Sequence, residues 1–361
     1  MTTPIDRVRE VLARRQMSQS QLAEAIGLDA SKMSKSLGGQ RRLSSLEFAR
    51  IAEVCEVSTD WLLTGSDDRV ALAARAETGS NVADAAAQAR GFVELAEVAE
   101  ELGRDWSRPL VELDDRTGRW REDGERMAVA ALAVPGAGEL LGALDLAGGI
   151  ERVFAVDVGV VDLGDTVDGL CAVQGNSRVL LAAPNPIAAR QRFTLAHELG
   201  HALAGDAAGL RVDVDVYNPG RDGSEQRANA FAAAFLMPAD VVEERLERVA
   251  GLDRSALATL ALDLKVSPLA LVHRLEGLRL IDGMTASRLG EMSMREAQDL
   301  TGRGPEWQSV VSAATAERRP AALGADLYRA YLEGETTLRP YARLLGVDVE
   351  TLRVSLEEAD G

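Results

Sequence analysis

A five-residue string near the middle of the chain, His197-Glu198-Leu199-Gly200-His201, has the residue types and spacing of a metal site. On an α-helix, residues four apart return to nearly the same face, so the two imidazoles can bind one ion. The carboxylate of Glu198 would then reach the coordination position where water binds. The string therefore predicts a Zn²⁺ site, with Mn²⁺ as the alternative ion, that hydrolyses peptide bonds with Glu198 as general base.

A catalytic zinc site takes three protein ligands and leaves one position open. An extended form of the motif would place Gly at 204 and His at 207, but the chain has Ala204 and Ala207. We therefore expect the third ligand from another segment, and the candidate is Glu225. It begins a predicted helix whose apolar stripe would pack against the first helix. The alternative is that Glu225 only complements the N-terminus of its own helix.

The surroundings of the string distinguish a metal site from a chance match on a solvated helix. The predicted helix, from about 189 to 204, is largely apolar, so its polar groups would be buried and would need partners. Gly200 lowers helix propensity, and it predicts a close approach of backbone or substrate.

Four further residues are candidates for accessory roles. Asp206 or Asn229 would orient a ligand histidine. Tyr217 and His273 are candidate donors to the oxyanion, and an ordinary structural role is an equal alternative for both.

The first 65 residues differ from the rest in charge. They carry nine Lys and Arg against eight Asp and Glu, whereas the remainder carries 31 against 49. The net charge of −17 argues against nonspecific nucleic-acid binding by the whole molecule, but it leaves room for a nearly neutral DNA-binding module. The sequence shows no signal peptide and no apolar run of membrane length, so a cytoplasmic protein without membrane contact is expected.

Residues 5–64 predict five short helices, with a tight turn between the second and third. The stretches 17–28, 31–35 and 57–63 resemble XRE-type helix-turn-helix domains. That resemblance implies a recognition helix over residues 30–37, and we expect the domain to bind DNA as a homodimer. Ser31, Lys32, Ser34 and Lys35 would read base edges and phosphates, and Arg41 or Arg42 would contact phosphate. The alternative is a helical bundle that serves only dimerisation or protein contacts.

The remaining segments predict a mainly α protein with a small antiparallel β-sheet, an α+β fold. We expect four regions: a helix-turn-helix domain (1–66), a helical connecting region (67–149), a metallopeptidase domain (150–282) and a helical C-terminal region (283–361). Strands are predicted at 153–156, 169–174 and 178–183. The last of these would pair with an extended peptide substrate.

Three segments align without gaps, at 21–37, 259–275 and 340–356. Each has an apolar start, a turn, a capping residue and two apolar positions four apart. All three are predicted to be helix-turn-helix units. The later two lack a basic recognition face, so they are expected to serve packing.

The strings 190–201 and 225–238 strongly resemble the ImmA/IrrE family of metallo-endopeptidases, over residues 150–282 in all. The resemblance implies that His197, His201 and Glu225 are metal ligands and that Glu198 is the base. It also implies a gluzincin-like peptidase that cleaves a repressor or partner protein and so regulates transcription. The alternative is a DNA-binding regulator whose peptidase fold senses a metal or a partner and cuts nothing.

Overall fold

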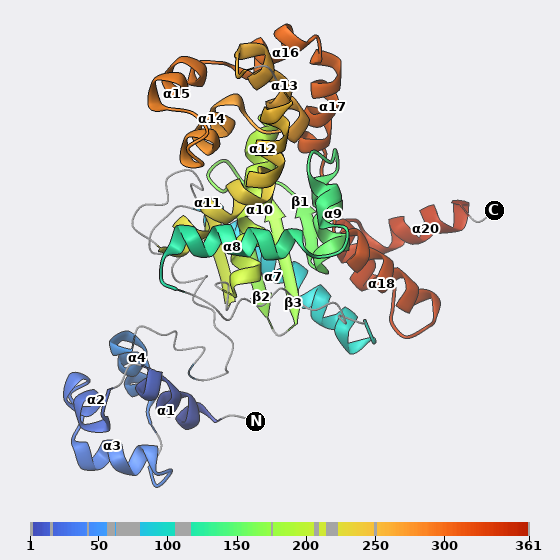
Figure 1. Cartoon of the computed structure of the whole chain (residues 1–361). Coiled ribbons are helices and arrows are strands. Elements are labelled where there is room, and N and C mark those ends of the chain that lie inside the picture. The colour runs from blue at the N-terminus through green and yellow to red at the C-terminus, as the bar shows by residue number, and fades with distance from the viewer. Residues whose placement is uncertain are drawn as a thin grey trace. The chain divides into compact units, whose positions relative to one another are not determined.

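The computed structural model describes residues 3–14, 17–41, 43–55, 62, 80–104, 117–174, 176–205, 209–213, 223–248 and 251–359. The chain divides into two compact units, Met1–Ala83 and Asp84–Gly361 (Figure 1).

The N-terminal unit contains α1 (Pro4–Arg14), α2 (Gln19–Ala25), α3 (Ala30–Leu37) and α4 (Ser45–Val54). Their apolar faces meet in one core, whose fully buried members include Val8, Leu22, Met33, Ile51 and Leu62. These helices match the first four predicted. The predicted fifth helix lies outside the described residues, apart from Leu62.

The second unit is built around a four-stranded sheet in the order β1-β3-β2-β4. The strands are β1 (Asp157–Val160), β2 (Gly169–Gln174), β3 (Ser177–Ala182) and β4 (Gly209–Asp213). The α+β class is confirmed, but the sheet is mixed rather than antiparallel. β2 runs antiparallel to β3 and β4, whereas β1 pairs parallel with β3, because the chain crosses over instead of forming a hairpin after β1.

The strand predicted at residues 153–156 is wrong. Residues 153 and 154 end helix α9 (Leu146–Phe154), and Ala155 terminates it in the left-handed region with φ of 52°. A short apolar run has no periodicity that separates a helix end from a strand, and this run lies at the junction of the two. The predictions for β2 and β3 were correct to within one residue.

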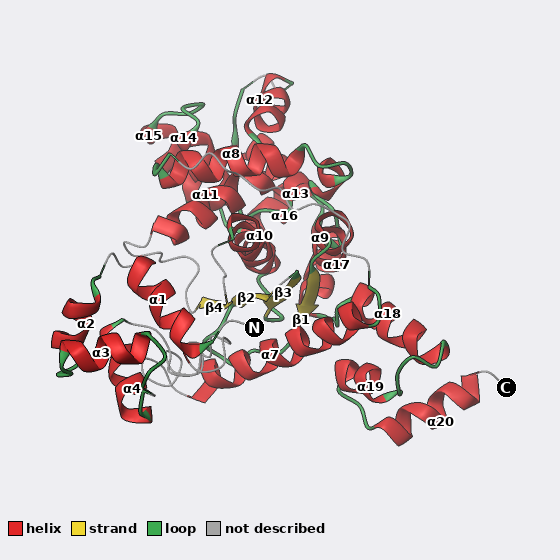
Figure 2. Ribbon diagram, turned by 90° about the horizontal axis from the view of Figure 1, so that it is seen from below, coloured by secondary structure: helices red, strands yellow, loops and turns green. Residues whose placement is uncertain are grey.

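Helices cover both faces of the sheet. α10 (Ala188–Ala204) lies on one face and α7 (Ser80–Glu101) on the other, as Figure 2 shows. Polar contacts hold α7 in place: the amide of Gln174 donates to Glu97 over 2.6 Å, and the hydroxyl of Ser177 donates to Glu100 over 3.1 Å. These two contacts tie the C-terminal part of α7 to β2 and β3.

α10 packs against α11 (Gly223–Leu236), and α11 packs along α8 (Trp120–Leu132). α8, η1 (Ala137–Leu140) and α9 share one hydrophobic core with α10 and α11, although the predicted connecting region, 67–149, contains α8, η1 and the start of α9. The remaining helices are α12 (Ala239–Glu247), α13 (Arg254–Leu264), α14 (Pro268–Gly277), α15 (Gly283–Gly290), α16 (Met294–Thr301), α17 (Gly304–Thr315), α18 (Ala321–Leu332), α19 (Arg339–Leu345) and α20 (Val349–Ala359).

The three predicted helix-turn-helix units correspond to α2–α3, α13–α14 and α19–α20. Each turn contains a left-handed residue at the equivalent position: Gly27 (φ 68°), Lys265 (φ 55°) and Gly346 (φ 71°). Two positions later, a polar side chain caps the second helix in each unit, namely Asp29, Ser267 and Asp348. The internal repeat is therefore confirmed at the level of backbone conformation.

Among the described helices, none is by itself long and apolar enough to cross a membrane. α13 and α14 reach that composition only together, and they meet at an angle of 101°. This angle is typical of a helix-turn-helix, and buried leucines of both helices belong to the main hydrophobic core.

Candidate metal centre

Helix α10 carries the two histidines and Glu198 in the interior of the second unit. The side chains of His197, Glu198 and His201 have no exposed surface. Gly200 lies where α10 meets α11: a Cβ at this position would be 2.9 Å from the ring of Phe231 and 3.4 Å from the Cα of Ala228. The expected close approach at Gly200 is thus made by a helix backbone and an aromatic ring.

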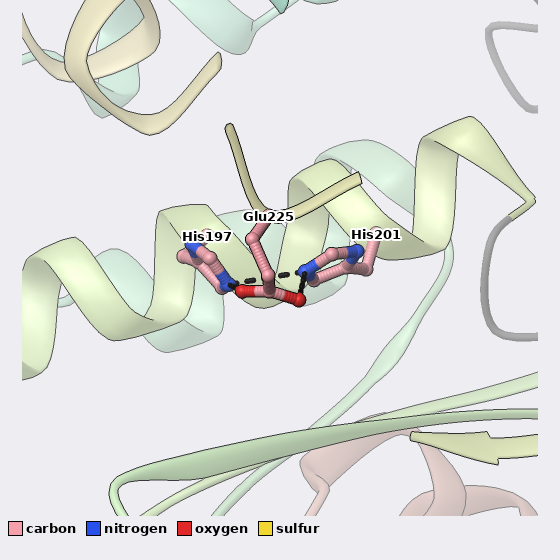
Figure 3. Close-up of side chains that lie close together, drawn as sticks. All are labelled: His197, His201 and Glu225. Atoms are coloured by element: carbon pink, nitrogen blue, oxygen red, sulfur yellow. Dashed lines mark hydrogen bonds and ion pairs between the residues drawn. The ribbon is translucent and has the colours of Figure 1, made fainter. Parts of the chain in front are cut away.

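The first turn of α11 brings Glu225 to the two histidines (Figure 3). Glu225 Oε2 lies 3.2 Å from His197 Nε2, and Glu225 Oε1 lies 3.3 Å from His201 Nε2. The two Nε2 atoms are 3.0 Å apart. Two imidazoles and one carboxylate from two different helices therefore converge on a single point.

This geometry fits a metal ion. Ligand atoms about 2.0 to 2.1 Å from a tetrahedral zinc lie roughly 3.3 Å from one another, close to the separations of these three groups. Among the described residues, His197, His201 and Glu225 are the group of His, Cys, Asp and Glu side chains whose ligand atoms are close enough to share an ion. Burial also favours a bound cation, because a carboxylate that loses its water needs a compensating charge.

Asn229, one turn after Glu225 on α11, lies against the other nitrogen of a ligand candidate. Its Oδ1 is 2.9 Å from His197 Nδ1. An amide oxygen only accepts, so this contact places the proton on Nδ1 and leaves the lone pair of Nε2 directed at the centre. Asn229 thus sits where the sequence proposed an orienting residue; Asp206, its alternative, lies outside the described residues.

Strand β2 closes over Glu198. The first residue of the strand, Gly169, approaches so closely that a Cβ there would lie 2.9 Å from Glu198 Oε1 and 2.5 Å from Thr194 Cγ2. Sequence reasoning missed Gly169, because a lone glycine at the start of a strand gives no indication of what it faces. The strand and the helix together confine the carboxylate.

The structure does not bring His273 into this group. Its side chain is exposed on α14, whereas the three converging groups are buried. Tyr217, the other proposed oxyanion donor, lies outside the described residues.

The predicted substrate strand needs correction. Residues 178–182 belong to β3, and β3 has β1 on one side and β2 on the other. Both of its edges are therefore occupied, and a peptide cannot add to it. The described strand that pairs on one side only and lies next to β2 is β4.

The predicted DNA-contacting residues lie in the N-terminal unit. Asp29 caps α3, accepting from the backbone N–H groups of Ser31 and Lys32 over 2.9 and 3.2 Å. Among the described side chains of α3, those of Ser31, Lys32, Ser34 and Lys35 are exposed, while Met33 and Leu37 face the core.

Arg41 is already engaged within its own unit. It donates to Glu47 over 2.7 Å and to the hydroxyl of Ser36 over 2.9 Å. The hydrogen bond from Arg41, together with that from the backbone N–H of Ser44, lowers the pKa of the Glu47 carboxyl to about 2. Arg41 therefore has a structural partner that the sequence did not reveal, and Arg42 lies outside the described residues.

A buried centre of two histidines from one helix and a glutamate from the next, beneath a small sheet, is the arrangement of a metallopeptidase. Comparison with known proteins agrees. Residues 156–276 match the profile of a family described as Peptidase M78, the IrrE N-terminal-like domain.

Two relatives are both described as radiation response metalloprotease IrrE. That of Deinococcus radiodurans is 41% identical over 126 residues, 34% of this chain and 37% of the relative. That of Deinococcus deserti is 42% identical over 89 residues, 24% of this chain and 31% of the relative. The chain thus matches about a third of the length of each. These matches support a metallopeptidase domain similar to the IrrE N-terminal-like domain over residues 156–276.

Proposed function

We propose that this chain is a zinc-dependent endopeptidase that regulates transcription. The observation that carries the proposal is the convergence of His197, His201 and Glu225 within 3.0 to 3.3 Å, with Glu198 buried on the same helix. Mn²⁺ is the alternative ion, since imidazole and carboxylate also bind it.

The side chains have distinct roles in this proposal. A divalent ion held by the three ligands would supply Lewis acidity to the scissile carbonyl and to the attacking water. Glu198 would accept the proton of that water and then deliver it to the leaving amine. Asn229 would hold the His197 ring in the tautomer that the site requires.

The substrate would bind as an added strand. Because both edges of β3 are paired, we now assign this role to β4, whose neighbour β2 covers Glu198 at Gly169. Main-chain hydrogen bonds to β4 would hold an extended segment, and side-chain pockets would select it.

The N-terminal unit would bind the chain to a specific DNA site. Ser31, Lys32, Ser34 and Lys35 are exposed on the second helix of a helix-turn-helix pair, the position from which such units contact the major groove. A peptidase on the same chain as a DNA-binding unit has a high effective concentration near its operator. The substrate we propose is therefore another DNA-bound repressor or a partner at that site.

Co-expression with the product of the neighbouring gene tests the proposal. The parent chain should cut this protein at one site. Glu198→Gln should retain metal and reduce cleavage at least about 100-fold, and Glu225→Ala should lose most of the metal. Equal cleavage by Glu198→Gln would reject the assigned base. Broad digestion of casein would point to a general protease, and metal binding without cleavage would point to a sensor that cuts nothing.

A further inference from the structure

Helix α8 packs against the back of the turn that presents Glu225. Trp120, the first residue of α8, lies with its ring 5.0 Å from the Arg227 guanidinium carbon. The same indole contacts the site of Gly223 so closely that any Cβ there would collide with it. Trp120 therefore touches α11 at two positions, one on each side of Glu225.

The helical periodicity of α11 shows on which side of the helix Trp120 makes this contact. Gly223 and Arg227 are four residues apart, so they lie on one face of the first turn of α11. Glu225 lies two residues from each and is rotated by roughly 200° from that face. The indole thus supports the turn from the side opposite to the carboxylate, which faces the histidines.

One turn further on, α8 and α11 touch through their backbones. A Cβ on Gly124 would lie 2.9 Å from the backbone nitrogen of Phe231, and it would also collide with the carbonyl oxygen of Arg227. Only glycine permits this approach. A side chain at position 124 would push α11 away from α8, and Glu225 would move with it.

α8 itself is firmly anchored. Asp123 is 3% exposed and accepts from the N–H and the hydroxyl of Thr117, over 3.1 and 2.8 Å. These hydrogen bonds attach the segment just before α8 to the first turn of the helix. Glu125 forms a two-point ion pair with Arg274 of α14. Because α8 is fixed at both positions, its contacts with α11 can fix where α11 lies.

We infer that Trp120 and Gly124 are positioning residues of the metal centre, and that α8 holds in place the turn of α11 that carries Glu225. α8 lies outside residues 156–276, which match the IrrE N-terminal-like domain. The part of this chain that binds metal would therefore begin before the matched region, at about residue 117. This inference rests on the proposed metal site and adds what sets the third ligand in place.

The test is Zn²⁺ affinity of the full chain, measured by competition with a chromophoric chelator. Gly124→Ala and Trp120→Ala should each weaken Zn²⁺ binding about tenfold or more, as loss of a ligand-supporting contact does. Trp120→Phe keeps a ring over Arg227 and should recover part of the affinity. Since alanine is the better helix former, a loss in Gly124→Ala would reflect the close approach and not helix propensity.

Two variants are matched controls. Gly138→Ala adds a methyl group with nothing within 4 Å, and Val129→Ala truncates a side chain of α8 that is 70% exposed. Both should bind Zn²⁺ as the parent does. Circular dichroism checks that each variant is folded, and Trp120 is 41% exposed, so its truncation leaves the core filled.

The outcomes separate this inference from the proposed function. If the parent binds Zn²⁺ and Glu225→Ala does not, but the Trp120 and Gly124 variants stay within twofold of the parent, α8 has no positioning role. If Glu225→Ala binds as tightly as the parent, the ligand assignment itself is wrong.

Discussion

The Nδ1 atom of His197 and the Oδ1 atom of Asn229 lie 2.9 Å apart, and this contact fixes which nitrogen of the histidine faces the candidate metal centre. Asn229→Ala would free the ring to rotate and to change tautomer. We expect Zn²⁺ affinity to fall about 10- to 100-fold, measured by chelator competition.

Asn229→Asp is the matched variant, because a carboxylate oxygen at the same place still accepts from Nδ1. It should bind Zn²⁺ at least as well as the parent. Unchanged affinity in Asn229→Ala would mean that packing alone orients His197.

Gly169→Ala should separate metal binding from chemistry. The added Cβ would lie 2.9 Å from Glu198 Oε1 and 2.5 Å from Thr194 Cγ2, so Glu198 must shift, and none of the three ligand candidates is among the three atoms nearest to it. We expect retained Zn²⁺ content, a fall in kcat on a confirmed substrate, and a loss of unfolding free energy of about 1 to 3 kcal/mol from overpacking.

Gly277→Ala, where nothing lies within 4 Å of the added methyl group, is the control for this substitution. It should leave both metal content and kcat unchanged. A Gly169→Ala variant with the kcat of the parent would show that Glu198 tolerates displacement and is not the base.

The sequence predicted the parts of the site that follow from local periodicity. His197 and His201 are four apart on a helix, and Glu225 lies in the first turn of a helix whose stripe, including Ala228 and Phe231, packs inward. Both relationships depend on spacing within one element, so they can be deduced from the chain alone.

What the sequence could not predict depends on contacts between distant segments. Gly169 and Glu198 are 29 residues apart, and Trp120 and Arg227 are 107 residues apart. No local sequence pattern around these residues predicts which distant residue each one contacts. The parallel pairing of β1 with β3 was missed for the same reason, since strand order is set by the whole sheet. The ion pair of Arg41 with Glu47 joins residues six apart around the start of α4, and it was not predicted from the sequence.

Glu47 should make the stability of the N-terminal unit depend on pH. Its pKa is lowered from 4.5 to about 2, first by the hydrogen bond from Arg41 and then by the backbone N–H of Ser44. A carboxyl with a lowered folded-state pKa stabilises the fold above its unfolded-state pKa, and this contribution is lost as the pH falls through the folded-state value. Glu47→Gln should therefore destabilise this unit at pH 7, and its difference from the parent should shrink between about pH 4.5 and 2.

A double-mutant cycle with Arg41→Met checks the cause. If the Arg41–Glu47 pair is responsible, the two losses of unfolding free energy at pH 7 will not add. Additive losses would instead assign the effect to the hydrogen bond that the Glu47 carboxylate accepts from the backbone N–H of Ser44, the residue before α4.

The proposed DNA contacts give a prediction about salt as well as affinity. Lys32 and Lys35 are exposed on α3, and their replacement leaves the core residues Met33 and Leu37 in place. Lys32→Ala/Lys35→Ala should keep the fold and weaken specific binding to a short palindromic duplex. Each phosphate contact that is lost should reduce the slope of log affinity against log salt by about 0.9. Fluorescence anisotropy at several salt concentrations measures both quantities.

The control for this pair must change the net charge equally without touching α3. Arg288→Ala/Arg295→Ala removes two exposed positive charges from the second unit and should change specific binding little. An equal loss in both double variants would mean that the net charge of this acidic chain, and not the α3 surface, governs DNA affinity. Full binding by Lys32→Ala/Lys35→Ala would instead favour a helical bundle that contacts protein, and the N-terminal unit would then recruit the peptidase to a partner rather than to DNA.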